Sequence, residues 1–161
     1  MNNYKFLFVI SILIPFLFLA QVKADSRKYV EIEWQDLVPK DWEPPIILPA
    51  HEDHQHVDAT SLVKSLSHKK IKLPGFMIPT KVEGQSVTEF VLVPFLEHHV
   101  NAHVHHDSNQ MLYVFLESPL KIDNPFQPFW VEGEILLESV ETKEGATGYT
   151  VKNARAEIYV Y

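Results

Sequence analysis

Cysteine is absent from the 161-residue chain, and basic residues are few. Without cysteine the protein has no disulfide framework, no thiolate metal site and no cysteine nucleophile. Lys and Arg together number 14 against 21 Asp and Glu, which gives a formal net charge of −7. Because a protein that tracks nucleic-acid phosphates needs a basic surface, this balance argues against nucleic-acid binding and favours cationic partners. Because cysteine is absent, any metal chemistry must use imidazole and carboxylate ligands.

Long apolar runs are also missing, except at the N-terminus. Residues 6–20 read FLFVISILIPFLFLA and follow a short segment that carries Lys5. About 15 apolar residues fall short of the roughly 20 that span a bilayer, so a signal peptide is favoured over a retained anchor. We predict cleavage after Ala24, which makes residues 1–24 the signal peptide. The mature protein is then expected to be periplasmic or secreted, with no stable membrane insertion.

The mature chain begins with an extended lead-in and continues as a β-rich domain. Residues 25–56 contain four prolines, which exclude a long helix or a central strand, and only one turn is expected, at residues 34–38. A short helix is predicted from a cap at Asp58 to Leu66, because apolar residues there share one face. Residues 57–161 are predicted to form the folded domain.

Five segments rich in β-branched and aromatic residues predict five strands. They are residues 70–78, 87–94, 110–116, 129–140 and 148–161. Gly75 and Gly133 lie inside predicted strands, where glycine is typical of a bulge or a sharp bend. The predicted class is mainly β: a small five-stranded barrel of the oligonucleotide/oligosaccharide-binding (OB) type, or a similar roll, with one short helix and a proline-rich lead-in.

Eight of the nine histidines fall in two short windows. The first window holds His51, His54 and His56, and the second holds His98, His99, His103, His105 and His106. Imidazole nitrogens bind zinc, copper and nickel, and alternate residues of an extended chain can face one ion. Glu97 and Asp107 flank the second window and could add a carboxylate ligand or orient an imidazole. Both windows are therefore candidate metal sites, and the alternative interpretation is a solvated, polar surface.

Known catalytic motifs do not fit these windows. The sequence HEDHQH differs from the zinc-protease motif H-E-x-x-H, because its second histidine comes one residue too early. No G-x-S-x-G elbow of a serine hydrolase is present. A zinc-dependent hydrolase would need a general base as well as three ligands, and Glu97 is the nearest candidate.

Several sequence blocks, taken together, resemble the DUF3299 family of exported bacterial proteins of unknown function. The blocks are EWQDLVP at residues 33–39, IKLPGFMIP at 71–79, TEFVLVPF at 88–95, NQMLYV at 109–114 and WVEG at 130–133. The family pattern has Gly-x-Cys-x-His and prolines where this chain has Glu97 to Asp107. A metal-ligand pair is thus exchanged for a histidine cluster, so no function can be transferred from members that keep the cysteine.

These observations lead to three hypotheses about function. The first is a periplasmic metal-binding protein, with zinc the expected ion and copper or nickel as competitors, that captures the ion or delivers it to a transport or storage partner. The second is a non-enzymatic adaptor that binds a membrane transporter, such as a permease, or another envelope protein. The third is the zinc-dependent hydrolase.

Overall fold

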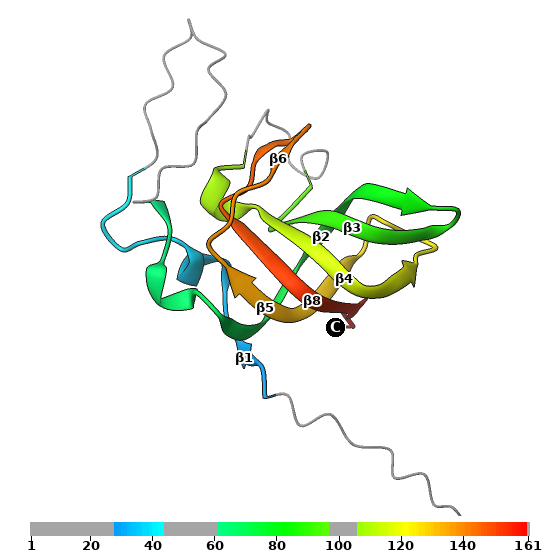
Figure 1. Ribbon diagram of the computed structural model, residues 1–161, viewed down its shortest axis with the longest axis horizontal. Helices are drawn as coiled ribbons and strands as arrows, with labels where there is room; N and C mark the ends of the chain where they lie inside the picture. Colours follow the sequence, from blue (N-terminus) through cyan, green and yellow to red (C-terminus); the bar gives the residue numbers. More distant parts are fainter. Residues whose placement is uncertain (1–27, 44–60, 97–105, 161) are drawn as a thin grey trace, which may run out of the picture.

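Five long strands dominate the computed structural model, which describes residues 28–43, 61–96 and 106–160. They are β2 (Lys69–Glu83), β3 (Ser86–Val93), β4 (Leu112–Lys121), β5 (Pro128–Leu136) and β8 (Tyr149–Ile158). Their order is β2-β3-β4-β8-β5, and β5 pairs again with β2, so the sheet closes into a barrel (Figure 1). The predicted five-stranded barrel is thereby confirmed.

The strand connections are those of an OB-type barrel. The third and fifth barrel strands, β4 and β8, pair in parallel, whereas the other barrel pairs are antiparallel. Two short additions extend this framework. Strand β1 (Val30–Glu31) pairs in parallel with β2, and β6 (Glu141–Thr142) forms a small hairpin with β7 (Gly145–Ala146) between β5 and β8.

The predicted helix from Asp58 to Leu66 is wrong over the part that the structure describes. Residues 61–66 contain only 3-10 structure, at Ser61 and in the turn η3 (Lys64–Leu66), and no α-helix occurs in residues 28–43, 61–96 or 106–160. Val63 is extended, with φ −83° and ψ 97°, and its N–H donates to the hydroxyl of Tyr149 at 2.7 Å. A tertiary hydrogen bond thus uses a donor that a helix would need, which ends the helical pattern.

Two apolar clusters stabilise the barrel. The larger one fills the interior and contains Phe90 and Leu92, while the smaller one lies on the other face of the sheet and contains Val91 and Val93. Strand β3 therefore buries both faces, and its four residues Phe90 to Val93 are all 0% exposed. This double burial explains why the segment reads as a continuous apolar run instead of an alternating one.

The lead-in packs against the barrel through the predicted turn, which is the 3-10 turn η1 (Trp34–Leu37). Leu37 is fully buried, and its carbonyl accepts a 2.7 Å hydrogen bond from the hydroxyl of Tyr149. The Trp34 indole N–H donates to the carbonyl of Pro74 at 2.7 Å. A Cβ at Gly75 would lie 2.8 Å from Trp34 Cζ2, so glycine lets the indole approach the strand. Figure 1 shows η1 and η3 on the same side of the barrel.

Strand β8 contains a bulge at Asn153. Glu132 pairs with Arg155 and Glu134 with Lys152, so β8 has one more residue than β5 over this stretch. Asn153 adopts a left-handed conformation, with φ 51°. A Cβ at Gly133, opposite the bulge, would lie 2.5 Å from Val151 Cγ1 and 2.9 Å from the Lys152 carbonyl oxygen. Glycine at this position is therefore required for β5 and β8 to approach each other, as the prediction of an interior bend anticipated.

Candidate functional site

Most of the predicted metal ligands lie outside the described residues. This group comprises His51, His54, His56, Glu97, His98, His99, His103 and His105. Of the predicted set, His106 and Asp107 are described, and they directly follow the segment 97–105. Within ranges 28–43, 61–96 and 106–160, no three or more His, Asp or Glu side chains are grouped so that they could hold a metal ion. The same ranges contain no helix long and apolar enough to cross a membrane.

His106 directly follows segment 97–105, which belongs to the histidine-rich connection between β3 and β4. Its ring packs against Phe95, with centroids 4.5 Å apart and planes inclined by 46°. Leu96, the last described residue before the connection, is 7% exposed and packs in the same apolar cluster as Met111. Apolar contacts therefore hold together the described residues on either side of segment 97–105.

The carboxyl group of Asp107 lies in a partly buried position. Burial raises the pKa of Asp107 above its usual 3.8, and the nearby charge of His106 acts in the opposite direction. A carboxyl that is costly to ionise gains more from a bound cation than an exposed carboxyl does. This environment is compatible with a ligand role for Asp107.

Asn109 links the ends of the two histidine-containing segments. Its side chain is 0% exposed, and its Nδ2 donates to the carbonyl of Ser61 at 3.2 Å. Ser61 directly follows the segment 44–60, which contains the first window. The neighbouring Ser108 carbonyl accepts a 2.6 Å hydrogen bond from the Gly148 N–H. A Cβ at Gly148 would lie 2.7 Å from that same oxygen and from Leu62 Cδ2. The chain around residues 62, 108 and 148 is therefore packed without space for a side chain at position 148.

A second polar arrangement lies across β2, β3 and β4. The Tyr113 hydroxyl donates to Glu89 Oε2 at 2.7 Å, and Lys81 Nζ is 3.0 Å from Glu89 Oε1. Burial tends to raise the pKa of Glu89, but the hydrogen bonds from Tyr113 and Lys81 outweigh it and hold the pKa below 4.5. Such a carboxylate stays ionised at neutral pH and is a poor proton acceptor. We interpret this arrangement as structural.

Sequence reasoning did not identify the contacts of Asn109 or of Tyr113. Asn109 donates a hydrogen bond to a residue 48 positions away, and Tyr113 donates one to a residue 24 positions away. Asn109 follows Ser108 in the 3-10 turn η5 (Ser108–Gln110), where polar residues are ordinary. A buried asparagine can be distinguished from an exposed one only when the fold is known.

Comparisons with known proteins agree with the fold. The family model "Protein of unknown function (DUF3299)" matches residues 34–158. The crystal structure of a DUF3299 family protein from Pseudomonas aeruginosa PAO1 is 31% identical and covers 83% of this chain and 98% of that chain, with a TM-score of 0.65. No curated protein matches the chain.

Proposed function

The chain belongs to the DUF3299 family, and we propose that this member is an exported protein that binds a divalent metal ion, Zn²⁺ before Cu²⁺ or Ni²⁺. Its role would be to capture the ion in the periplasm and pass it to a transport or storage partner. The family has no known function from which this could be taken. The proposal therefore rests on this chain's own residues.

The observation that carries the proposal is the hydrogen bond between Asn109 Nδ2 and the Ser61 carbonyl, at 3.2 Å. It brings together the residues that follow the two histidine windows. Chain length alone keeps His56 within about 18 Å of Ser61, and His105 within about 11 Å of Ser108. Ligands from both windows can therefore reach one ion. Two unrelated histidine clusters on the surface would have no reason to lie near each other.

The chemistry of the chain supports a cation as the ligand. Eight imidazoles supply more than the three or four nitrogen ligands that a zinc site needs. The net charge of −7 attracts cations over a distance. Protons compete for imidazole near its ordinary pKa of about 6.5, so affinity should fall as the pH decreases from 7.5 to 5.5.

The test is a competitive Zn²⁺ and Cu²⁺ titration of the full chain made without a histidine tag. A variant with alanine at positions 98, 99, 103, 105 and 106 is compared with His68→Asn. His68 is a suitable control because its side chain is 74% exposed, and asparagine tolerates its positive φ of 62°. We expect near-stoichiometric, sub-micromolar binding that is lost in the alanine variant and kept in the control. Weak binding that is equal in all three proteins would contradict the proposal and favour the adaptor hypothesis.

A further inference from the structure

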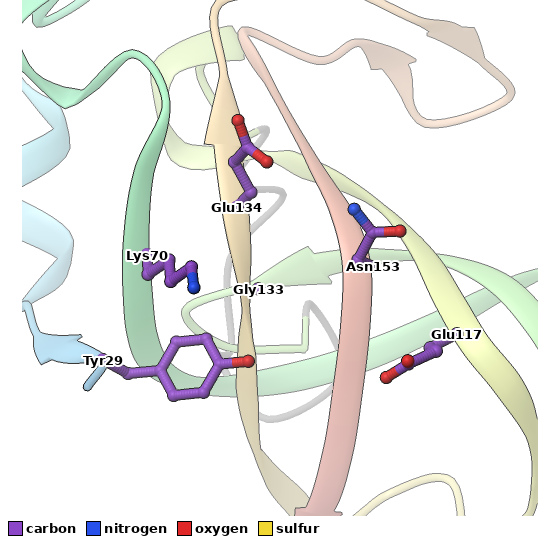
Figure 2. A pocket seen from close by; sticks show the side chains of 6 residues that line it. All are labelled: Tyr29, Lys70, Glu117, Gly133, Glu134 and Asn153. Atoms are coloured by element: carbon purple, nitrogen blue, oxygen red, sulfur yellow. The ribbon is translucent and has the colours of Figure 1, made fainter. Parts of the chain in front are cut away.

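A polar pocket lies on the outside of the barrel, over β5 and β8. Its volume is about 260 Å³. The residues that line it are Tyr29, Lys70, Glu117, Gly133, Glu134 and Asn153 (Figure 2). Pockets for drug-sized ligands occupy roughly 300 to 1,000 Å³, so this one suits a smaller molecule.

The β8 bulge forms part of the pocket lining, through Asn153 and the opposing Gly133. The extra residue, Asn153, is held with φ 51°, a conformation that asparagine adopts more readily than most residues. Gly133 permits the bulge, since any Cβ there would lie 2.5 Å from Val151 Cγ1. Bulges are over-represented next to active sites, where they re-aim a side chain. The bulge carries Asn153 at the pocket edge, opposite Lys70 (Figure 2).

The walls of the pocket differ in charge. Figure 2 shows Lys70 and Tyr29 on one side and Glu117 and Asn153 on the other, with Glu134 at the end of the pocket. Contacts hold both carboxylates in place: Arg155 Nε donates to Glu117 Oε2 at 3.0 Å, and His68 Nδ1 is 2.8 Å from Glu134 Oε1.

Two of the polar groups in the pocket have no internal partner. In residues 28–43, 61–96 and 106–160, neither the Lys70 ammonium nor the Asn153 amide makes a hydrogen bond or ion pair. These groups are thus available to a ligand. A neutral ligand would displace water from charged walls without replacing its interactions, and an ion of one sign would meet a like charge on one wall.

We propose that this pocket binds a small zwitterion of the free α-amino acid class. The carboxylate of the ligand faces Lys70 and the Tyr29 hydroxyl, and its ammonium group faces Glu117 and Glu134. The site uses none of the predicted metal ligands. Failure of the metal-binding proposal would therefore leave this one unaffected, and the reverse also holds.

The experiment is a ¹H–¹⁵N NMR titration of the full chain with L-alanine, in buffer that contains EDTA. EDTA excludes complexes that form through a metal ion. Ethylamine and propionate, each carrying one of alanine's two charges, are titrated in parallel. We expect alanine to shift the amide signals of Gly133 and Asn153 with a dissociation constant of about 1 to 10 mM. The singly charged compounds should bind at least about tenfold more weakly, because each loses one charge-assisted hydrogen bond.

The matched variants are Lys70→Met and Lys143→Met. Lys143 is exposed in the turn between β6 and β7, away from the residues that line the pocket. Lys70→Met should weaken alanine binding about tenfold, whereas Lys143→Met should bind as the native chain does. Matching melting temperatures show that both variants fold. The proposal is overturned if alanine does not shift Gly133 and Asn153, if ethylamine or propionate binds as tightly, or if Lys70→Met has no effect.

Discussion

Replacing Tyr149 with phenylalanine should measure how strongly the lead-in is attached to the barrel. The side chain is 0% exposed, and its hydroxyl makes two 2.7 Å hydrogen bonds, to the Leu37 carbonyl and from the Val63 N–H. Burial raises the pKa of Tyr149, although the hydrogen bond from Val63 acts against this, so the hydroxyl stays protonated at neutral pH. The substitution removes this hydroxyl and leaves the ring in place.

The size of the effect follows from the groups that lose their partner. A buried donor or acceptor left without a hydrogen bond costs about 1 to 3 kcal/mol. Here one N–H and one C=O are affected: the hydrogen bond to the Leu37 carbonyl is buried, and the one from the Val63 N–H is partly buried. Since some relaxation and water entry will reduce the sum, we expect the free energy of unfolding to fall by about 2 to 4 kcal/mol.

The assay is urea unfolding followed by tryptophan fluorescence. Tyr113→Phe is the control, because it is the same chemical change at a side chain that bonds to the side chains of Glu89 and Thr80 instead of buried backbone. It should cost about 1.5 kcal/mol, the low end for a hydrogen bond to a charged group, because the Glu89 carboxylate keeps its contact with Lys81. The Tyr149 variant should lower the midpoint without changing the slope. A loss below about 0.5 kcal/mol, or one equal to that of the control, would refute the inferred role of Tyr149.

Three further substitutions test other parts of the account. Gly133→Ala should destabilise the fold by about 1 to 3 kcal/mol through the 2.5 Å contact with Val151, and a midpoint within error of the native chain would be inconsistent with the close β5–β8 approach. A Cβ added by Gly84→Ala would have no other atom within 4 Å. The substitution should lower the free energy of unfolding by about 1 kcal/mol in the same assay, from the positive φ of 63° alone. Asp107 ionises less easily when folded, so it contributes stability below pH 3.8 that is lost as the pH rises through its raised folded-state pKa. In metal-free buffer, the Asp107→Asn variant should therefore be more stable than the native chain at about pH 7 but not at about pH 3. If the difference in unfolding midpoint between variant and native chain is the same at both pH values, the carboxyl is not buried.

Local sequence patterns predicted the strands well, but tertiary contacts changed their limits. All five predicted strands overlap β2, β3, β4, β5 and β8. The first predicted strand covers residues 70–78 and ends just before Pro79. Strand β2 instead continues to Glu83, and its pairing with β3 shifts register just after Pro79. The helix prediction was wrong over its described part, residues 61–66, because the Val63 N–H bonds to Tyr149, which is remote in sequence.

The candidate sites were predictable only in part. Clustering alone identified the histidine windows, and chain order placed the second one between two strands. The sequence could not indicate that Asn109 bonds to Ser61, nor that Lys70 and Asn153 line one pocket, because these residues are distant along the chain. The bulge at Asn153 depends on pairing with two neighbouring strands at once.

The most direct test of the account is a zinc-binding cycle with four proteins. They are the native chain, a variant with alanine at positions 51, 54 and 56, a variant with alanine at 98, 99, 103, 105 and 106, and the combination of both. If the two windows share one ion, the native chain binds one zinc, and the losses in binding free energy are not additive. Two independent zinc sites with additive losses, or weak binding that none of the variants alters, would contradict the claim that Asn109 and Ser61 bring the windows to one metal site.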